Sequence, residues 1–175
     1  YPSQRGWAGT WPKGTRQGTS YGCKGGGSER YVWSRKTKEK RPGVQGYGEG
    51  RMEIKTFFFD TYAFFEILVH NPRYLPYTKN IGVVTSRLNL MEFHYGLLRL
   101  HGKAVADQWY DRLVPFVTEV TDDVIKAATT FRFSYKERKL SYVDCLGYII
   151  AQLRGIRFLT GDRMFKDFPN VEFVE

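Results

Sequence analysis

The sequence has few of the features that define secreted, membrane-spanning or zinc-binding proteins. Its 175 residues include two cysteines, Cys23 and Cys145, which are far apart and lack the spacing of a zinc site or a disulfide framework. The longest apolar run, residues 57–69, is interrupted by Asp60 and Glu66 and is shorter than the ~20 residues that a membrane-spanning helix needs. No pattern of a signal peptide is present. These absences predict a cytoplasmic protein without a membrane span.

Residues 1–51 lack most of the side chains that build a protein core. They contain no Leu, Ile, Phe or Met, and they hold 12 of the 18 glycines. They also carry 11 lysines and arginines against 3 acidic residues, so the net charge of +9 lies almost wholly in this segment. Such a chain cannot bury enough apolar surface to offset its conformational entropy. We therefore expect residues 1–51 to be disordered or weakly ordered, and residues 52–175 to form the folded domain.

Three interpretations of the basic segment remain open. Its aromatic side chains alternate with basic ones, as in an arm that binds single-stranded nucleic acid by phosphate neutralisation and base stacking. It could also be an added leader. The third interpretation is translated upstream sequence, because residues 48–51 read Gly-Glu-Gly-Arg directly before Met52, and a purine-rich ribosome-binding sequence read in frame gives Gly-Glu-Gly.

From Met52 onward, strand signals alternate with helical patterns. Strands are expected at residues 54–59, 81–85, 116–120, 156–160 and 171–174. Helices are expected at residues 62–69, 86–102, 103–114, 121–139, 141–154 and 162–167, with a loop at residues 73–80. This alternation predicts an α/β fold with a doubly wound parallel sheet.

Four acidic residues occupy positions where such a sheet places functional groups, at the carboxyl ends of its strands. Asp60 directly follows the first predicted strand and Asp162 follows the fourth. Glu92 lies two turns into the helix after the second strand, and Asp144 lies near the start of a later helix. Crowded carboxylates repel one another, so such a cluster implies raised pKa values or a bound cation. Hard oxygen ligands select Mg²⁺ or Mn²⁺, and two such ions ~4 Å apart can hold the attacking and leaving oxygens of a phosphodiester cleavage.

Each acid also has an ordinary structural interpretation. Asp60 could be a plain N-cap, Asp144 could close a capping-box-like turn with Ser141, and Asp162 could complement a helix N-terminus. Glu92 could lie on a solvated helix face. The occurrence of all four in this order along the chain favours a shared site.

The stretches that carry these acids resemble the successive motifs of PIN-domain proteins, the ribonuclease superfamily that includes VapC-type toxins. The four stretches are residues 57–61, 85–92, 140–144 and 159–165, and the resemblance as a whole extends over residues 54–174. It implies a three-layer α/β/α domain, with a central parallel sheet of four to five strands, that cleaves RNA using Mg²⁺ or Mn²⁺. It also implies that Asp60, Glu92, Asp144 and Asp162 are the catalytic and metal-binding acids, and that Thr160 hydrogen-bonds within the site.

The substrate of such a site is expected to be unpaired RNA, because an acidic pocket needs an accessible backbone. Candidate phosphate contacts are Arg163, beside Asp162, and Arg73 and Lys79 in the loop after the first helix. Each of these three could equally be a solvated surface charge.

The apolar helical surface of residues 62–80 and 86–110 would suit a homodimer or the helix of an antitoxin protein, with core packing as the alternative. Two other function classes also remain open. One is a catalytically inactive PIN-like module for RNA binding or assembly, and the other is a metal-dependent DNA nuclease.

Overall fold

The computed structural model of the chain describes residues 33–34 and 54–175. All of them belong to one of the two units into which the chain divides, residues 31–175. The expectations for residues 1–51 therefore lie, apart from Trp33 and Ser34, outside the described residues. Within the described part of the chain, no helix is both long and apolar enough to cross a membrane.

The described residues form a parallel sheet of six strands. The strand order is β1-β3-β2-β5-β6, β4 also pairs with β3, and every pairing is parallel. The strands are β1 (Trp33–Ser34), β2 (Thr56–Phe59), β3 (Ile81–Ser86), β4 (Val117–Thr118), β5 (Arg157–Thr160) and β6 (Val171–Phe173). The strands β2 to β6 are the five predicted ones, so the predicted parallel α/β fold is confirmed. The two-residue strand β1 comes from the basic segment, where no strand was expected.

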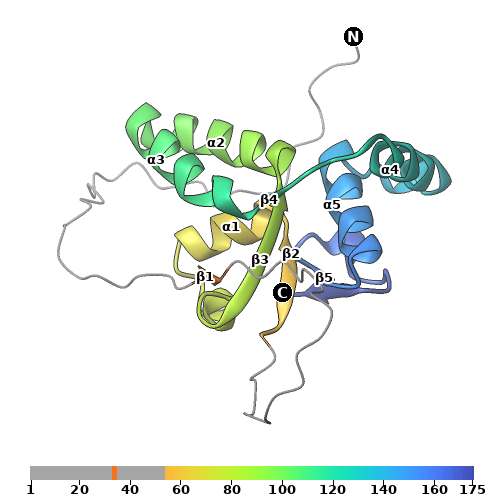
Figure 1. Cartoon of the computed structure of the whole chain (residues 1–175), viewed down its shortest axis with the longest axis horizontal. Coiled ribbons are helices and arrows are strands. Elements are labelled where there is room, and N and C mark those ends of the chain that lie inside the picture. The colour runs from red at the N-terminus through yellow and green to blue at the C-terminus, as the bar shows by residue number, and fades with distance from the viewer. Residues whose placement is uncertain (1–32, 35–53) are drawn as a thin grey trace, which may run out of the picture. The chain divides into compact units, whose positions relative to one another are not determined.

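Helices cover both faces of this sheet. Figure 1 shows α1, α2 and α3 on one side of the strands and α4 and α5 on the other, which makes the three predicted layers. The helices are α1 (Thr61–Leu68), α2 (Arg87–His101), α3 (Lys103–Leu113), α4 (Asp122–Ser134) and α5 (Tyr142–Leu153). Short 3₁₀ helices connect them: η1 (Pro72–Tyr77), η2 (Val114–Phe116), η3 (Lys136–Arg138) and η4 (Arg163–Phe165).

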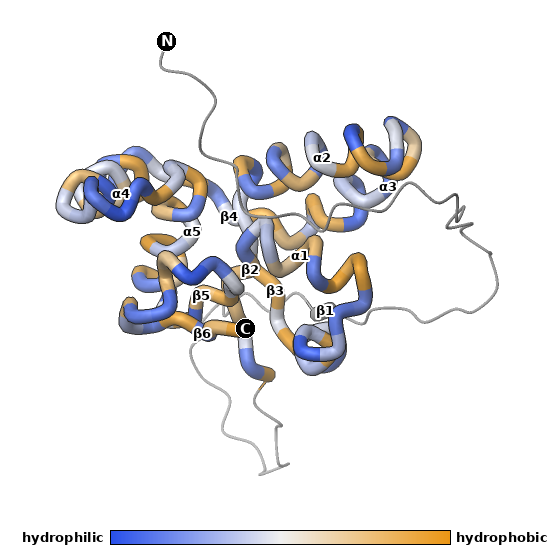
Figure 2. The backbone as a smooth tube through the Cα atoms, turned by 180° about the vertical axis from the view of Figure 1, so that it is seen from behind, coloured by the Kyte–Doolittle hydropathy of each residue, from blue (hydrophilic) through white to orange (hydrophobic). Residues whose placement is uncertain are grey.

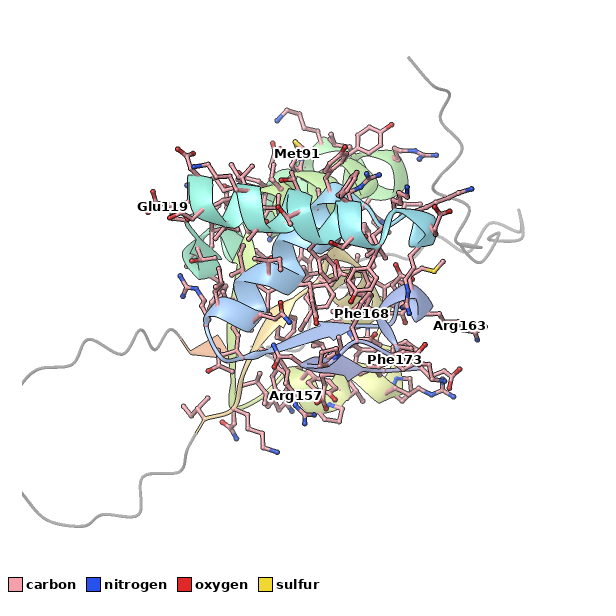
Figure 3. The ribbon with its side chains drawn as sticks, turned by 90° about the vertical axis from the view of Figure 1, so that its right-hand side faces the viewer. Met91, Glu119, Arg157, Arg163, Phe168 and Phe173 are labelled. Atoms are coloured by element: carbon pink, nitrogen blue, oxygen red, sulfur yellow. The ribbon has the colours of Figure 1, made fainter. Side chains whose placement is uncertain are left out.

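The three successive phenylalanines of β2 explain why the sheet is covered twice. Successive side chains of a strand point to opposite faces, and all three are buried. Phe57 and Phe59 pack into the core beneath α1, α2 and α3, whereas Phe58 packs into the core beneath α4 and α5. Gly147 lets α5 approach closely, because a Cβ atom there would lie 2.5 Å from the Phe58 ring. Figure 3 shows Phe168 in this second core, between the helix layer and the strands.

The helices of both layers are amphipathic, as their position over a sheet requires. Figure 2 shows hydrophobic and hydrophilic residues alternating along α4, which has one face on the core and one in solvent. The buried residues Val124 and Ala128, four positions apart, form the core-facing side of α4. Such a helix is stabilised mainly by packing, so its presence follows from the apolar spacing in the sequence.

Three predicted elements differ from the structure in extent. The expected loop at residues 73–80 contains η1, which begins at Pro72 behind the capping side chain of Asn71. The helix expected over residues 121–139 ends at Ser134, and the left-handed backbone of Lys139, with φ +53°, stops the short η3 that follows. The strand expected over residues 116–120 shortens to β4, because a 3₁₀ turn with Pro115 takes up its first residue.

Candidate active site

The parallel sheet brings two of the predicted acids to one edge. Asp60 follows β2 directly, and its main-chain N–H donates to the carbonyl of Leu159 at 3.1 Å, which ties it to β5. Thr160 ends β5, and Asp162 follows two residues later. Because β2 and β5 are parallel neighbours, residues that follow their carboxyl ends must lie close together.

Asp60 is held on both carboxylate oxygens. The side chain is 2% exposed. Its Oδ1 accepts the main-chain N–H of Thr61 at 2.6 Å, so Asp60 caps α1 as its structural interpretation required. Its Oδ2 accepts the hydroxyl of Thr160 at 2.7 Å, and the oxygen of that hydroxyl accepts the main-chain N–H of Asp162 at 3.0 Å. Asp60 therefore caps α1 and, at the same time, accepts the hydrogen bond that was predicted for Thr160 within the site.

Glu92 reaches the same region from α2. Its Oε2 accepts the hydroxyl of Thr61 at 3.0 Å, so Thr61 touches two of the acids, with its N–H on Asp60 and its hydroxyl on Glu92. The solvated face that was the alternative for Glu92 does not apply, because burial and this hydrogen bond fix its carboxylate.

A buried polar network behind Glu92 was not predicted from the sequence. Asn89 Nδ2 donates to Thr61 Oγ1 at 3.2 Å, and Ser86 Oγ donates to Asn89 Oδ1 at 2.6 Å. The main-chain N–H of Asn89 returns a hydrogen bond to Ser86 Oγ at 3.2 Å. The available signal was the Ser-x-x-Asn spacing at the start of α2, which is the spacing of a helix capping pair. The sequence does not reveal that this pair is fully buried and faces Thr61.

Asp144 and Asp162 complete the set from α5 and from the loop after β5. Ser141 caps α5, and its hydroxyl accepts the N–H of Asp144 at 3.0 Å. Asp162 caps η4 by accepting the N–H of Met164 at 2.9 Å. The capping interpretation is thus correct for the backbone around both acids. Both carboxylates nevertheless act electrostatically within the site: Asp144 on Asp60 and Glu92, and Asp162 on Asp144.

The pKa values of Asp60, Glu92 and Asp144 are raised by burial and by neighbouring negative charges. Burial raises the pKa of Asp60 well above its ordinary value, and the charges of Asp144 and Glu92 raise it further, against the lowering effect of its hydrogen bonds. Burial, and then the charge of Asp144, raises the pKa of Glu92 to about 7. Burial also raises the pKa of Asp144, and the charge of Asp162 adds to that increase. The expectation that crowding would raise pKa values therefore holds for Asp60, Glu92 and Asp144, although burial is the larger cause for each of them.

The described residues offer these acids little positive charge. None of the ion pairs between described residues includes Asp60, Glu92, Asp144 or Asp162. Buried carboxylates without a cationic partner are costly, and a divalent cation with hard oxygen ligands would relieve that cost. In the part of the chain described by the structure, no group of three or more His, Cys, Asp or Glu side chains is already arranged to hold a metal ion. Because their ligand atoms are hard carboxylate oxygens, the four acids suit Mg²⁺ or Mn²⁺. In this structure they contact neutral hydrogen-bond donors and one another.

Two of the three predicted phosphate contacts come together. Arg163 Nη2 lies 3.6 Å from Glu175 Oε1, and Arg73 Nη1 donates to the main-chain oxygen of Glu175. Lys79 is exposed and precedes the first residue of β3 by two positions. Since β3 is parallel to β2, Lys79 lies at the amino end of the sheet, opposite to the edge that carries Asp60.

Comparisons with known proteins agree with this fold. A family model described as PIN domain matches residues 57–171. The VapC20 toxin of Mycobacterium tuberculosis, described as cleaving the sarcin-ricin loop, has a TM-score of 0.57 at 25% identity, covering 68% of this chain and 99% of that chain. A toxin-antitoxin complex from Klebsiella pneumoniae gives 0.54 at 19% identity, with coverage of 65% and 93%. VapBC2 from Rickettsia felis, bound to a DNA fragment from its promoter, gives 0.52 at 19% identity, with coverage of 69% and 97%.

No curated protein matches the chain. The two structures at 19% identity support the fold alone. The family match covers β3, β4, β5, most of β2 and all four acids, so it covers the whole of the candidate site.

Proposed function

The chain belongs to the PIN-domain family, and from that premise we propose that it is a divalent-metal-dependent endoribonuclease that cleaves RNA at Asp60, Glu92, Asp144 and Asp162. One observation carries the proposal. Four carboxylates from four separate stretches of the chain interact within one largely buried region, and none of them pairs with a cation among the described residues. A site that only needed stability would place neutral or oppositely charged groups there.

In this proposal each residue has a stated task. Asp60, Glu92 and Asp144 hold Mg²⁺ or Mn²⁺, and Asp162 holds a second ion or orients the attacking water. When bound, the ion supplies Lewis acidity toward the phosphodiester and toward water. Thr160 and Thr61 fix the two oxygens of Asp60, and Thr61 also fixes Glu92, so the oxygen ligands keep their orientation when the substrate arrives.

RNA, in unpaired form, is the proposed substrate. One structural neighbour is described as a toxin that cleaves the sarcin-ricin loop. Residues 52–175 carry 16 lysines and arginines and 15 acids, so the domain has little excess positive charge to hold a duplex. Arg73 and Arg163 remain the proposed phosphate contacts near the acids, and Lys79 would contact RNA only beyond the opposite end of the sheet.

An antitoxin protein is the proposed partner. Two of the structural neighbours are toxin-antitoxin assemblies. On α2, the exposed side chains Met91, Tyr95 and Leu98 are 57%, 61% and 38% exposed and follow the spacing of one helix face, which suits a partner helix. A homodimer through this face is the other arrangement, and light scattering on the purified chain distinguishes dimer from monomer.

The decisive experiment is a cleavage assay on an unstructured RNA with Mn²⁺ against an EDTA control. We expect cleavage that requires Mn²⁺ and is abolished by Asp60→Asn and by Asp144→Asn. The matched control is Asp123→Asn, since Asp123 is 94% exposed and lies on α4. RNA binding without cleavage would indicate an inactive module, and cleavage of single-stranded DNA in preference to RNA would indicate a DNA nuclease.

A further inference from the structure

One large aromatic side chain beside the acids is left open to solvent. Tyr62 lies two residues after Asp60, in the first turn of α1, and is 42% exposed. Its neighbours Thr61 and Ala63 are 4% and 0% exposed, so of these three residues only Tyr62 faces solvent. The exposed ring is therefore a feature of the site rim and is not part of the core.

The ring is held against the backbone of the site. A Cβ atom at Gly161 would lie 2.4 Å from Tyr62 Cε1, so glycine at this position allows the ring to rest on the chain between Thr160 and Asp162. On another side the ring packs against the buried Tyr74, with centroids 6.4 Å apart and planes at 53°. The ring is thus fixed by two contacts while part of its surface stays free.

The hydroxyl of Tyr62 lies within electrostatic reach of an acid on its own helix. Glu66, one turn further along α1, acts on it, and Asn71 Nδ2 donates to Glu66 Oε2 at 2.6 Å. Burial and then Glu66 raise the pKa of Tyr62, and the charges of Asp162 and Arg163 also act on it. Tyr62 therefore lies within electrostatic reach of an acid of the site and of a proposed phosphate contact.

Two arginines lie on segments next to this ring. Arg163 follows Asp162 directly and has an 81% exposed side chain, and Figure 3 shows it extending away from the ribbon. Arg73 belongs to η1, which also carries Tyr74, and both arginines contact Glu175. A strand of RNA whose cleaved phosphodiester lies at the acids would place its next phosphate and base in this neighbourhood.

We propose that Tyr62 is a stacking platform for one unpaired nucleobase of the RNA, adjacent to the phosphodiester that is cleaved. This inference rests on the proposed function and adds a base-binding subsite to it. A fixed, half-exposed aromatic ring loses little freedom when a base stacks on it, and stacking tolerates any base because every base has a π-face. Arg163 and Arg73 hold the phosphates on either side of that base.

The first test compares Tyr62→Leu with Tyr62→Phe in steady-state cleavage of a short unpaired oligoribonucleotide with Mn²⁺. Loss of the ring is expected to raise KM about tenfold with kcat within about twofold, as the loss of one stacked base predicts. Tyr62→Phe keeps the ring and is expected to keep the wild-type KM. The control is Phe133→Leu, an exposed aromatic that is 75% exposed near the end of α4. Equal KM values for Tyr62→Leu and the wild type would overturn the inference.

The second test uses the wild-type chain alone, so it stands even if Tyr62→Leu does not fold. Binding in EDTA is measured by fluorescence anisotropy for oligoribonucleotides in which one base at a time is removed while the backbone stays intact. We expect one position next to the cleavage site at which base removal weakens binding about tenfold. Uniform binding at every abasic position would disprove the platform. Absence of Mn²⁺-dependent cleavage by the wild type would instead disprove the proposed nuclease, because the binding measurement needs no metal.

Discussion

Two groups of charged side chains meet at the helix α2, and their electrostatics are opposite. Glu92 faces Asp60 and Asp144, and burial with the charge of Asp144 raises its pKa to about 7. Two residues later, His94 lies 3.0 Å from Asp107 of α3, whose other oxygen pairs with Lys103. The hydrogen bonds from Lys103 and His94 lower the pKa of Asp107. In the second cluster the carboxylate pairs with basic side chains, whereas no cation among the described residues pairs with the acids of the first cluster.

The largest expected difference between the clusters is in catalysis. Asp60→Asn is expected to lower RNA cleavage by roughly 10³-fold or more, because a bound metal supplies several kcal/mol of transition-state stabilisation. Asp107→Asn is expected to leave the rate within about twofold, since Asp107 only joins α2 to α3. Single-turnover cleavage with Mn²⁺ measures both. A comparable loss in the two variants would show that the comparison between the clusters is wrong.

Metal binding gives the next largest effect. Mn²⁺ at about 100 times its dissociation constant is expected to stabilise the fold by about 2.7 kcal/mol. Asp144→Asn is expected to lose most of this stabilisation and Asp107→Asn to retain it. Thermal unfolding with Mn²⁺ and with EDTA tests this. An unfolding temperature of the wild type that does not respond to Mn²⁺ would contradict the assignment of the acids as metal ligands.

Removing the Thr61 hydroxyl, which donates to Glu92, should have an intermediate effect on RNA cleavage. Thr61→Val preserves shape but removes the hydroxyl that fixes Glu92, and a loss of about 10- to 100-fold in cleavage is expected, as for other groups that orient metal ligands. Thr61→Ser restores the hydroxyl and is expected to recover most of the rate. A valine variant as active as the serine variant would mean that the buried network serves folding alone.

The smallest effect is a difference in pH dependence of stability. The pKa of Glu92 is higher in the folded chain, about 7, than its ordinary value of 4.5. The folded state therefore binds more protons, and stability in EDTA falls as pH rises from about 4.5 to 7, by at most about 1.4 kcal/mol per pH unit. The lowered pKa of Asp107 works in the opposite direction, because the stability it gives is lost as pH falls through its folded pKa.

Urea unfolding of Glu92→Gln and Asp107→Asn between pH 4.5 and 8 separates these contributions. The glutamine variant should lack part of the decline above pH 4.5 and be more stable than the wild type at pH 8. An unchanged slope in Glu92→Gln would show that Glu92 is not held in a protonated state by its surroundings.

The sequence predicts those parts of the fold that depend on local pattern. The run Phe57–Phe59 indicated a strand buried on both faces, and Asp60 after it indicated a site at the carboxyl end, since both conclusions need only strand geometry and the parallel sheet rule. The depth of burial of Asn89 and its contact with Thr61 depend on how α1 and α2 pack. No periodicity in either helix specifies that contact.

The ends of helices and the pairings between distant strands were less predictable, because they also depend on how the elements assemble. The position of Lys79 relative to the acids follows from the direction of β3, which only the assembled sheet fixes. Helix α4 ends at Ser134, and the short η3 after it stops at the left-handed residue Lys139, although the lysine side chain itself favours continuing a helix. Strand β1 pairs with a segment almost 50 residues away, and two residues are too few to show the alternation typical of a strand.

That pairing bears on how the domain should be shortened for experiments. Trp33 and Ser34 pair with Ile81 and Gly82 along the outer side of β3. A version beginning at residue 52 would leave that stretch of backbone unpaired, and an open strand edge invites association between molecules. A version beginning near residue 31 keeps the edge covered while it removes most of the glycine-rich sequence. We therefore expect the shorter version to self-associate and the longer one to remain monodisperse under the same conditions.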